Sequence, residues 1–206
     1  MLRLYDYWES GNCYKVRLLL HQQEREFTCV PLDILQGDTK TSEYQAINPN
    51  QKVPLLEWPD GRRLAESNAI LFALADGTPW LPADSWDRAQ ILQWMFFEQY
   101  SHEPNVAVVR FWHFSGTVDQ HQQDLPGKME RGHHALKVME AHLTGRQFFV
   151  GERYSIADIA LYAYTHVAHE GKFDMSLYPA IQAWLGRVAA QDRYIGLEQP
   201  VGVASS

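Results

Sequence analysis

Four small or polar residues, Ser10, Gly11, Asn12 and Cys13, stand where an apolar segment runs into a helical pattern in WESGNCYKVRLLL. Ser, Gly and Asn are favoured at helix starts, because side-chain oxygens there accept hydrogen bonds from backbone N–H groups. Donors at the positive end of a helix also stabilise an anion, including a thiolate. Ser10 and Asn12 are therefore candidates both for capping and for anion binding.

The thiol of Cys13 is the competing candidate for chemistry at this corner. Cys13 lies on an apolar helical stripe with Val16 and Leu20, which favours a core position over a nucleophile. No charge-relay base follows Ser10 closely in the sequence, so Ser10 suits the role of a hydrogen-bond donor better than that of a nucleophile. Tyr5, on the preceding apolar segment, is a reserve candidate for this role.

Two other stretches carry polar groups at the start of an element. Glu66 and Ser67 open a helical pattern, where Ser67 can cap the helix or bind a carboxylate at its N-terminus while Glu66 pairs with an ammonium. Val53-Pro54 enters a strand pattern, and a proline there cannot donate to the sheet ladder. On position alone a trans bond is favoured, because only about 5% of X-Pro bonds are cis.

The histidines are scattered, so the sequence predicts no metal site. His166 and His169 are three residues apart on a helical pattern, but no third histidine or companion carboxylate accompanies them.

Composition bounds the class of protein. The 206 residues carry a formal net charge of -7 and no long basic run, which disfavours nucleic acid as a partner. No apolar run reaches the roughly 18 residues of a membrane span, and no signal-peptide pattern is present. The only cysteines are Cys13 and Cys29, which form no CxxC pair, so we expect a cytoplasmic protein that does not act at membranes.

The hydrophobic periodicity changes in the middle of the chain. Up to residue 76 it predicts strands at 2–8, 26–34 and twice within 53–67, and helices at 13–23, 41–48 and 67–76. Beyond a segment rich in Gly, Pro and Asp it predicts only helices, at 86–115, 124–144, 155–170 and 177–191, with Pro104 kinking or splitting the first. Ser155 and Asp158 form a capping signature, and the tail GLEQPVGVASS is expected to be loose. The expected fold class is an α/β unit followed by an all-α unit.

At four places the chain resembles the cytosolic glutathione transferase family. ESGNCYKVRLLL is similar to the first-helix motif of bacterial, zeta-like members, and its Ser–x–Asn spacing to the Nu-class pattern. NPNQKVPLLE, LAESNAIL and SIADIAL resemble the family's loop before the third strand, its γ-glutamyl segment and its helical-domain capping box. The resemblance implies a thioredoxin-like domain at 1–77, a linker at 78–85 and a helical-bundle domain at 86–206.

The resemblance also implies roles for individual residues. Ser10 and Asn12 would stabilise the thiolate of glutathione as the catalytic donors. Pro54 would be cis, which reverses the expectation from position alone. The residues expected to bind the tripeptide are Gln51 or Lys52 at the glycyl carboxylate, Val53 and Pro54 at the cysteinyl part, and Glu66 and Ser67 at the γ-glutamyl group.

The aromatic stretch from Trp94 to Phe114 has two interpretations. It can be helical core, or it can face the glutathione sulfur as in the family and line an electrophile pocket. The polar residues predicted for that pocket are Tyr100, His102, Asn105, Arg110 and His113, with Arg110 or His102 neutralising developing negative charge.

The resemblance implies a glutathione transferase that adds the thiolate of glutathione, its co-substrate, to an electrophilic small molecule in detoxification. No permanently bound cofactor is expected. Two alternatives remain open: a glutathione-dependent disulfide reductase or peroxidase, and a non-catalytic interaction protein. The family also implies a homodimer, with residues 72–80 and 91–95 at the contact. The sequence does not predict which electrophile is used.

Overall fold

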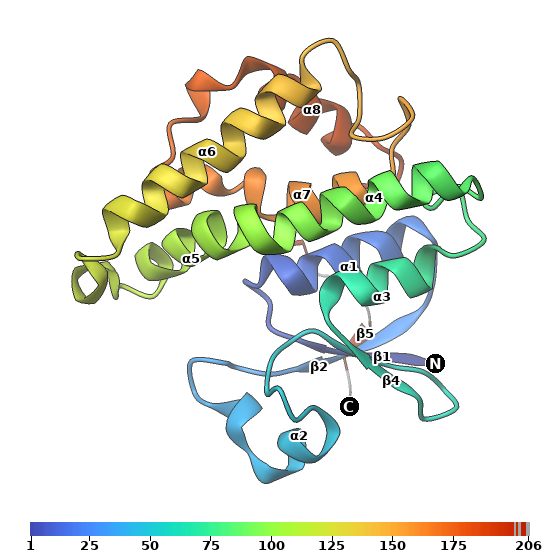
Figure 1. Ribbon diagram of the computed structural model, residues 1–206. Helices are drawn as coiled ribbons and strands as arrows, with labels where there is room; N and C mark the ends of the chain where they lie inside the picture. Colours follow the sequence, from blue (N-terminus) through green and yellow to red (C-terminus); the bar gives the residue numbers. More distant parts are fainter. Residues whose placement is uncertain (200, 202, 205–206) are drawn as a thin grey trace. The chain divides into compact units, whose positions relative to one another are not determined.

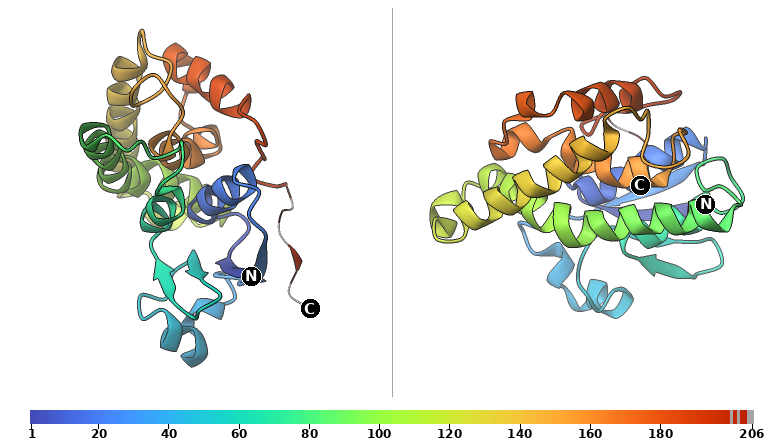
Figure 2. Two further views of the ribbon diagram at one scale, coloured as in Figure 1. Left: turned by 90° about the vertical axis from the view of Figure 1, so that its right-hand side faces the viewer. Right: turned by 45° about the horizontal axis from the view of Figure 1, so that its top comes forward.

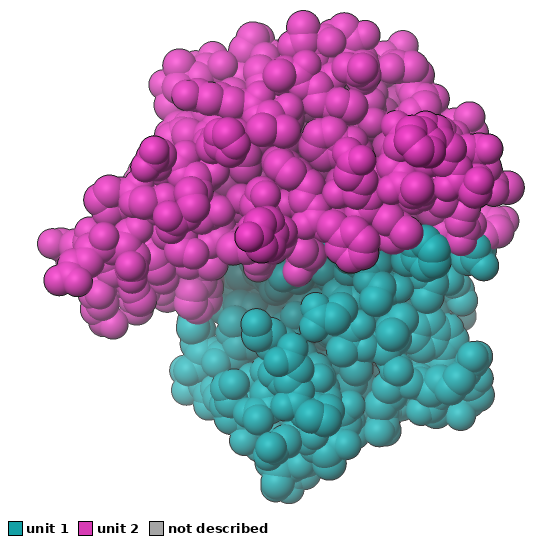
Figure 3. Space-filling model, viewed as in Figure 1, with its two compact units in different colours: residues 1–76, 192–206 teal, residues 77–191 magenta. Residues whose placement is uncertain are grey.

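The computed structural model describes residues 1–199, 201 and 203–204. Two compact units make up the chain, and Figure 3 colours them separately: Met1–Asp76 together with Asp192–Ser206, and Gly77–Gln191. The family resemblance implies a helical domain over all of 86–206. In the structure, the residues from Asp192 onward group with the first unit instead.

A five-stranded sheet in the order β4-β3-β1-β2-β5 forms the centre of the first unit (Figure 1). The strands are β1 (Leu2–Asp6), β2 (Phe27–Pro31), β3 (Leu55–Glu57), β4 (Arg63–Ala65) and β5 (Val203–Ala204). β1 pairs in parallel with β2 and antiparallel with β3, with Tyr5 opposite both Val30 and Leu55. β4 is antiparallel to β3, and β5 is parallel to β2.

Helices cover both faces of this sheet. α1 (Gly11–Gln22) and α3 (Ser67–Ala75) pack together on one face, and α2 (Ser42–Ile47), preceded by a 3-10 turn at Asp38–Lys40, lies on the other (Figure 1). Successive side chains of a strand point to opposite faces, so β1 contributes to both cores. Leu4 is fully buried, and Tyr5 belongs to a buried cluster with Tyr44 and Leu55. Tyr5 is therefore a core residue rather than a thiol donor.

An ion pair buried within the first unit joins β1 to α1. Arg17 Nη1 lies 2.6 Å from Asp6 Oδ1, and both side chains are almost fully buried. Arg17 Nη2 donates to the carbonyl of Trp8 at 2.8 Å, and the guanidinium stacks over the Trp8 ring. A buried charge must be paired to be tolerated, and the Asp6 carboxylate pairs with Arg17 at the corner where strand becomes helix.

The predicted loose tail is ordered where the structure describes it. Ile195 and Leu197 are buried, and their carbonyl oxygens accept from Tyr14 Oη at 2.7 Å and from Arg17 at 3.3 Å. Residues 203–204 then add β5 to the edge of the sheet, so the expectation of no strand beyond residue 87 was wrong. The tail completes the first unit.

The second unit is helical in its major elements. They are α4 (Ser85–Phe97), a π-helical segment (Glu98–His102), α5 (Glu103–Phe114), α6 (Leu125–Leu143), α7 (Ile156–Thr165) and α8 (Pro179–Ala189), with short 3-10 turns at Val118–His121, Ala168–Gly171 and Met175–Leu177. The predicted helix at 86–115 is thus split just before Pro104, as its proline indicated. The fold class predicted from the sequence is confirmed.

α7 is the buried centre of the helical unit. Each of its residues is buried, and it packs against α4, α5 and α8 (Figure 2). The predicted capping signature is confirmed, because Asp158 accepts from the backbone N–H and the hydroxyl of Ser155 at 2.9 and 3.0 Å. Asp158 also accepts from Trp184 Nε1 and from the Phe149 N–H, which ties α7 to its neighbours.

Among the described residues, every helix is too short or too polar to cross a lipid bilayer.

Candidate functional site

The corner between β1 and α1 holds the first pair of predicted residues. Ser10 is the N-cap of α1, and its Oγ accepts from the Cys13 N–H at 3.3 Å. Capping occupies a lone pair of the hydroxyl oxygen and leaves the O–H as a donor. The half-buried Ser10 therefore both caps α1 and keeps the donor that thiolate binding requires.

Asn12 belongs to a hydrogen-bonded trio that joins α1 to α3. Asn12 Oδ1 lies 2.8 Å from Lys15 Nζ and 3.1 Å from Ser67 Oγ, and Lys15 Nζ lies 3.4 Å from Ser67 Oγ. Lys15 is fully buried and Ser67 is buried. Residues 55 positions apart in the sequence, Asn12 and Ser67, are thus in direct contact. Sequence reasoning missed Lys15, although its i, i+3 spacing from Asn12 could have suggested it.

Cys13 faces the core, as its place on the apolar stripe indicated. Its side chain is fully buried, and the Tyr7 N–H donates to Sγ at 3.4 Å. Burial, together with the nearby charge of Asp6, raises the pKa of the Cys13 thiol well above its ordinary range. The same two causes raise the pKa of Cys29 to about 11. Neither cysteine has the electropositive, accessible setting of a reactive thiolate.

The loop before β3 is held by its backbone. The Val53-Pro54 bond is cis, as the family resemblance implied. The Lys52 carbonyl accepts from Tyr44 Oη and from Asn48 Nδ2, each at 2.7 Å. Val53 packs against the cluster of Tyr5, Tyr44 and Leu55. These contacts fix the course of the chain immediately before the cis bond.

Glu66 occupies an uncommon backbone conformation at the start of α3. Its φ is +68°, a region that costs free energy for a residue with a side chain and is found preferentially at ligand-binding positions. Asn50 Nδ2 donates to Glu66 Oε1 at 3.3 Å, which brings the loop of Gln51 and Lys52 beside the helix start. Gln51 is also left-handed, with φ of +55°. The eight residues predicted to bind glutathione thus come from three neighbouring segments of the first unit.

The predicted electrophile-pocket residues are mostly engaged inside the helical unit. His102 lies 3.0 Å from the Thr165 hydroxyl, and Arg110 forms a 2.6 Å ion pair with Glu170. Asn105 donates to the Ser101 carbonyl at 2.7 Å. All three are buried, whereas His113 is half-buried and Tyr100 is 88% exposed.

These contacts argue against one expected role, the neutralisation of developing negative charge by Arg110 or His102. Arg110 already neutralises a carboxylate and stacks near the Phe114 ring, so it is not a spare cation for developing charge. His102 is fully buried and bonded to a side chain of α7, which is a structural position. Helical periodicity alone could not reveal this, because both partners lie about 60 residues away along the chain.

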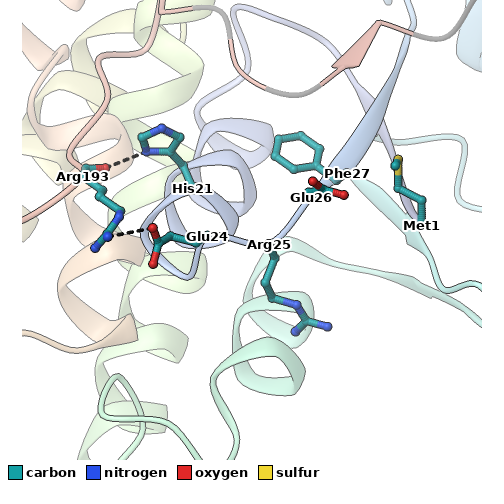
Figure 4. A pocket seen from close by; sticks show the side chains of 7 residues that line it. All are labelled: Met1, His21, Glu24, Arg25, Glu26, Phe27 and Arg193. Carbon is teal, nitrogen blue, oxygen red and sulfur yellow. Dashed lines mark hydrogen bonds and ion pairs between the residues drawn. The ribbon is translucent and has the colours of Figure 1, made fainter.

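A different hollow of the first unit, of about 480 Å³, is lined by none of the predicted site residues described above (Figure 4). Its lining includes His21, Glu24, Phe27 and Arg193, with a 2.7 Å ion pair between Arg193 and Glu24. His21 is in the last turn of α1, Glu24 follows that helix and Phe27 begins β2, so the hollow is at the amino end of the parallel strands. Ligands of α/β sheets bind at the carboxyl end, where Ser10 and Asn12 lie. In the described part of the chain, no cluster of three or more His, Cys, Asp or Glu could hold a metal ion.

Solved structures of other proteins have the same overall fold. A glutathione S-transferase from Pseudomonas fluorescens Pf-5 is 49% identical with a TM-score of 0.94, over 96% of this chain and 99% of that one. A second family member from that strain, solved with two glutathione bound, is 28% identical with a TM-score of 0.84, over 97% and 93%.

Among relatives of described activity, the disulfide-bond oxidoreductase YfcG of Escherichia coli is 28% identical over 93% of this chain and 91% of its own length. The maleylacetoacetate isomerase of Rhizobium meliloti is 31% identical over 93% and 92%.

The family comparison agrees with the fold. Residues 1–76 match the glutathione S-transferase N-terminal domain, and residues 89–192 match the C-terminal domain. The first match contains every residue of the corner, the loop and the α3 start described above. The chain belongs to the glutathione S-transferase family.

Proposed function

We propose that the protein binds glutathione in its first unit and stabilises the thiolate for attack on an electrophilic small molecule. One observation carries the proposal: Ser10, Asn12, Glu66 and Ser67, which have the chemistry for a thiol and an amino-acid group, are brought together at the carboxyl end of β1. The similar protein from Pseudomonas fluorescens, which was solved with glutathione bound, supports glutathione as the ligand.

The tripeptide would be held along three segments. The Glu66 carboxylate pairs with the ligand ammonium, and the N-terminus of α3 at Ser67 favours the adjacent carboxylate. The backbone of Val53 pairs with the cysteinyl part, and Gln51 or Lys52 contacts the glycyl carboxylate. This orientation directs the sulfur to the corner of Ser10 and Asn12.

Modest hydrogen bonding is enough to activate the thiol. A free thiol has a pKa of about 8.5, and each unit of lowering corresponds to about 1.4 kcal/mol of preference for the anion. Hydrogen bonds to a charged group contribute about 1.5–3 kcal/mol each. One or two donors from Ser10 and Asn12 therefore suffice to populate the thiolate near neutral pH.

A second function, glutathione-dependent reduction of disulfides or peroxides, is favoured by the Ser–x–Asn pattern and by the similarity to the Escherichia coli disulfide-bond oxidoreductase. Glutathione itself would be the attacking thiol. This reaction needs no protein thiolate, and the raised pKa values of Cys13 and Cys29 are consistent with that.

Calorimetric titration with glutathione, followed by parallel assays with a chloronitrobenzene and with hydroxyethyl disulfide, tests these functions. Turnover of the chloronitrobenzene alone supports transfer, and turnover of the disulfide alone supports reduction. Binding without either reaction would leave a non-catalytic interaction protein. Absence of glutathione binding would contradict the proposal as a whole.

Glu66 tests the placement of the ligand. Glu66→Ala and Glu66→Gln both leave the ligand ammonium without a charged partner, and each should raise the KM for glutathione more than about tenfold. Asn50→Ala is the matched control, because it removes the neighbour of Glu66 but keeps the carboxylate. An unchanged KM in both Glu66 variants would refute the placement.

We also propose that the protein is a cytoplasmic homodimer, with a contact that differs from the one expected. Ile91, Trp94 and Met95 are buried within the chain and cannot line it. The exposed stripe of α4 instead contains Trp86, Ala89, Gln93 and Phe96.

An apolar helix stripe can pair with its own copy across a two-fold axis. Sedimentation of the wild type should give a mass near twice 23.8 kDa, and Phe96→Glu should shift it toward a single chain. Gln90→Glu, on a less exposed side of α4, is the control. A wild-type mass of one chain at micromolar concentration would exclude the dimer.

A further inference from the structure

Lys15 is a buried cation whose partners on α1 and α3 are residues of the candidate site. Its Nζ lies 2.8 Å from Asn12 Oδ1 and 3.4 Å from Ser67 Oγ, and the side chain is fully buried. Arg17, two residues further along the same helix, forms a buried ion pair with Asp6.

The ammonium of Lys15 settles the orientation of the Asn12 side chain. An ammonium has three donors and no acceptor, so the amide atom 2.8 Å from it must be the carbonyl oxygen. The Ser67 hydroxyl reinforces this orientation by donating to the same oxygen at 3.1 Å. The Asn12 amide consequently directs its two N–H donors away from Lys15 and Ser67.

The same contacts determine which hydrogen bonds the Ser67 hydroxyl donates and which it accepts. Lys15 can only donate to Ser67 Oγ, and the one hydroxyl proton of Ser67 is directed at Asn12. Toward a ligand, Ser67 Oγ is then an acceptor, suited to an ammonium. Its backbone N–H, in the first turn of α3, suits a carboxylate. The hydroxyl and the N–H together match an α-amino-acid group.

We propose that Lys15 is a positioning residue that couples recognition of the γ-glutamyl group to activation of the thiol. This inference rests on the proposed function. Lys15 orients Asn12 toward the sulfur and Ser67 toward the amino-acid end, and the Asn12–Ser67 hydrogen bond makes the two orientations interdependent.

Lys15→Met keeps most of the side-chain volume and removes the ammonium. It should raise the Kd for glutathione about tenfold and lower kcat/KM about 100-fold, in whichever reaction the wild type catalyses. With γ-glutamylcysteine, Lys15→Met should lower kcat/KM as much as it does with glutathione. With cysteinylglycine, which lacks the γ-glutamyl group, kcat/KM should change less than about threefold. Lys15→Arg, which keeps a buried donor-only cation, should recover most of the lost affinity.

Val16→Ala is the matched control for stability. Val16 is a fully buried α1 residue outside the trio, so its truncation should lower the melting temperature and leave Kd and kcat/KM unchanged. Equal losses of activity in Val16→Ala and Lys15→Met would show that Lys15 acts only by stabilising the fold, and would overturn the inference.

A double-mutant cycle tests the coupling even if Lys15→Met does not fold. Asn12→Ala and Ser67→Ala should be non-additive in kcat/KM by at least about fivefold in the wild-type background. Additive effects would overturn the proposed coupling. If the wild type does not bind glutathione at all, the proposed function fails first, which is a distinguishable result.

Discussion

Ser10 and Cys13 are three residues apart and differ mainly in their surroundings. The Cys13 thiol is enclosed by the core, where burial and Asp6 disfavour its anion. The Ser10 hydroxyl is half-buried at the positive end of α1, where a neighbouring anion is favoured. An anion at this corner is therefore stabilised when it belongs to a ligand beside Ser10, and destabilised when it belongs to the protein.

We expect Ser10→Ala and Asn12→Ala each to lower kcat/KM by about 10- to 100-fold and to raise the kinetic pKa of bound glutathione, because each removes a donor to the thiolate. Cys13→Ala should leave both quantities within about twofold and cost about 1–2 kcal/mol of stability. The pH dependence of kcat/KM for the three variants measures these effects.

Ser10→Thr is the control for capping, because it keeps both the cap and the donor. If Cys13→Ala abolished turnover while Ser10→Ala did not, the donor mechanism would be wrong and a protein thiol would replace it.

Local sequence was sufficient for some of these residues and insufficient for others. The capping by Ser10 depends on residues within one helical turn, which a short motif contains. Lys15 was not predicted, because lysine is normally exposed and its contact with Ser67 spans 52 residues. The engagement of His102 and Arg110 escaped prediction for the same reason, since helical spacing does not specify which helix packs opposite.

At the scale of elements, α7 depends on a single buried carboxylate. Four donors surround Asp158: the N–H and hydroxyl of Ser155, the Phe149 N–H and Trp184 Nε1. Burial raises the pKa of Asp158 to about 6, against the opposing effect of these hydrogen bonds. A folded-state pKa above the unfolded value means that the folded protein binds the proton more tightly.

At pH 4, where Asp158 is protonated, Asp158→Asn should cost about 2–3 kcal/mol, because the amide NH₂ brings one more N–H than the carboxyl group among the N–H donors. The difference in unfolding free energy between wild type and variant should be largest near pH 4 and shrink as the pH rises through 6. The size of the pKa shift limits this pH-dependent change in the unfolding free-energy difference to about 3 kcal/mol. Urea unfolding of both proteins between pH 4 and 7 provides the measurement. A difference that grows with pH would show that the four donors outweigh burial.

The helix predicted at 86–115 illustrates what an element's sequence can reveal. Pro104 has no N–H and indicated an interruption, which is where α4 gives way to α5. The form of the interruption was not predictable from the proline alone. The Glu103 N–H donates to the Glu98 carbonyl, five residues back, so the chain widens into a π-helical segment.

At the scale of the whole molecule, the first unit is completed by the tail, the segment that begins at Asp192. Its Gly and Pro residues and short apolar pairs gave no helical or strand periodicity, and a two-residue strand is too short to recognise in a sequence. Its described residues form hydrogen bonds with β2 and α1, more than 170 residues earlier in the chain.

Removing residues 192–206 should destabilise the first unit by at least about 3 kcal/mol, because the buried side chains of Ile195 and Leu197 and the hydrogen bonds to Tyr14 and Arg17 are lost. Removing only residues 200–206 keeps those contacts and should cost less. Thermal unfolding of the two truncated chains gives the comparison. Equal melting temperatures would mean that Ile195 and Leu197 contribute little.

The discontinuity of the first unit has a consequence for biosynthesis. The ribosome releases β1, α1 and β2 first, but the carbonyl that accepts from Tyr14 is synthesised 181 residues later. The helical unit, which is continuous in the sequence, has all of its residues before the first unit does. The domain translated first is thus the last to acquire its full set of contacts, and until β5 is synthesised the outer edge of β2 is open to pairing with other nascent strands.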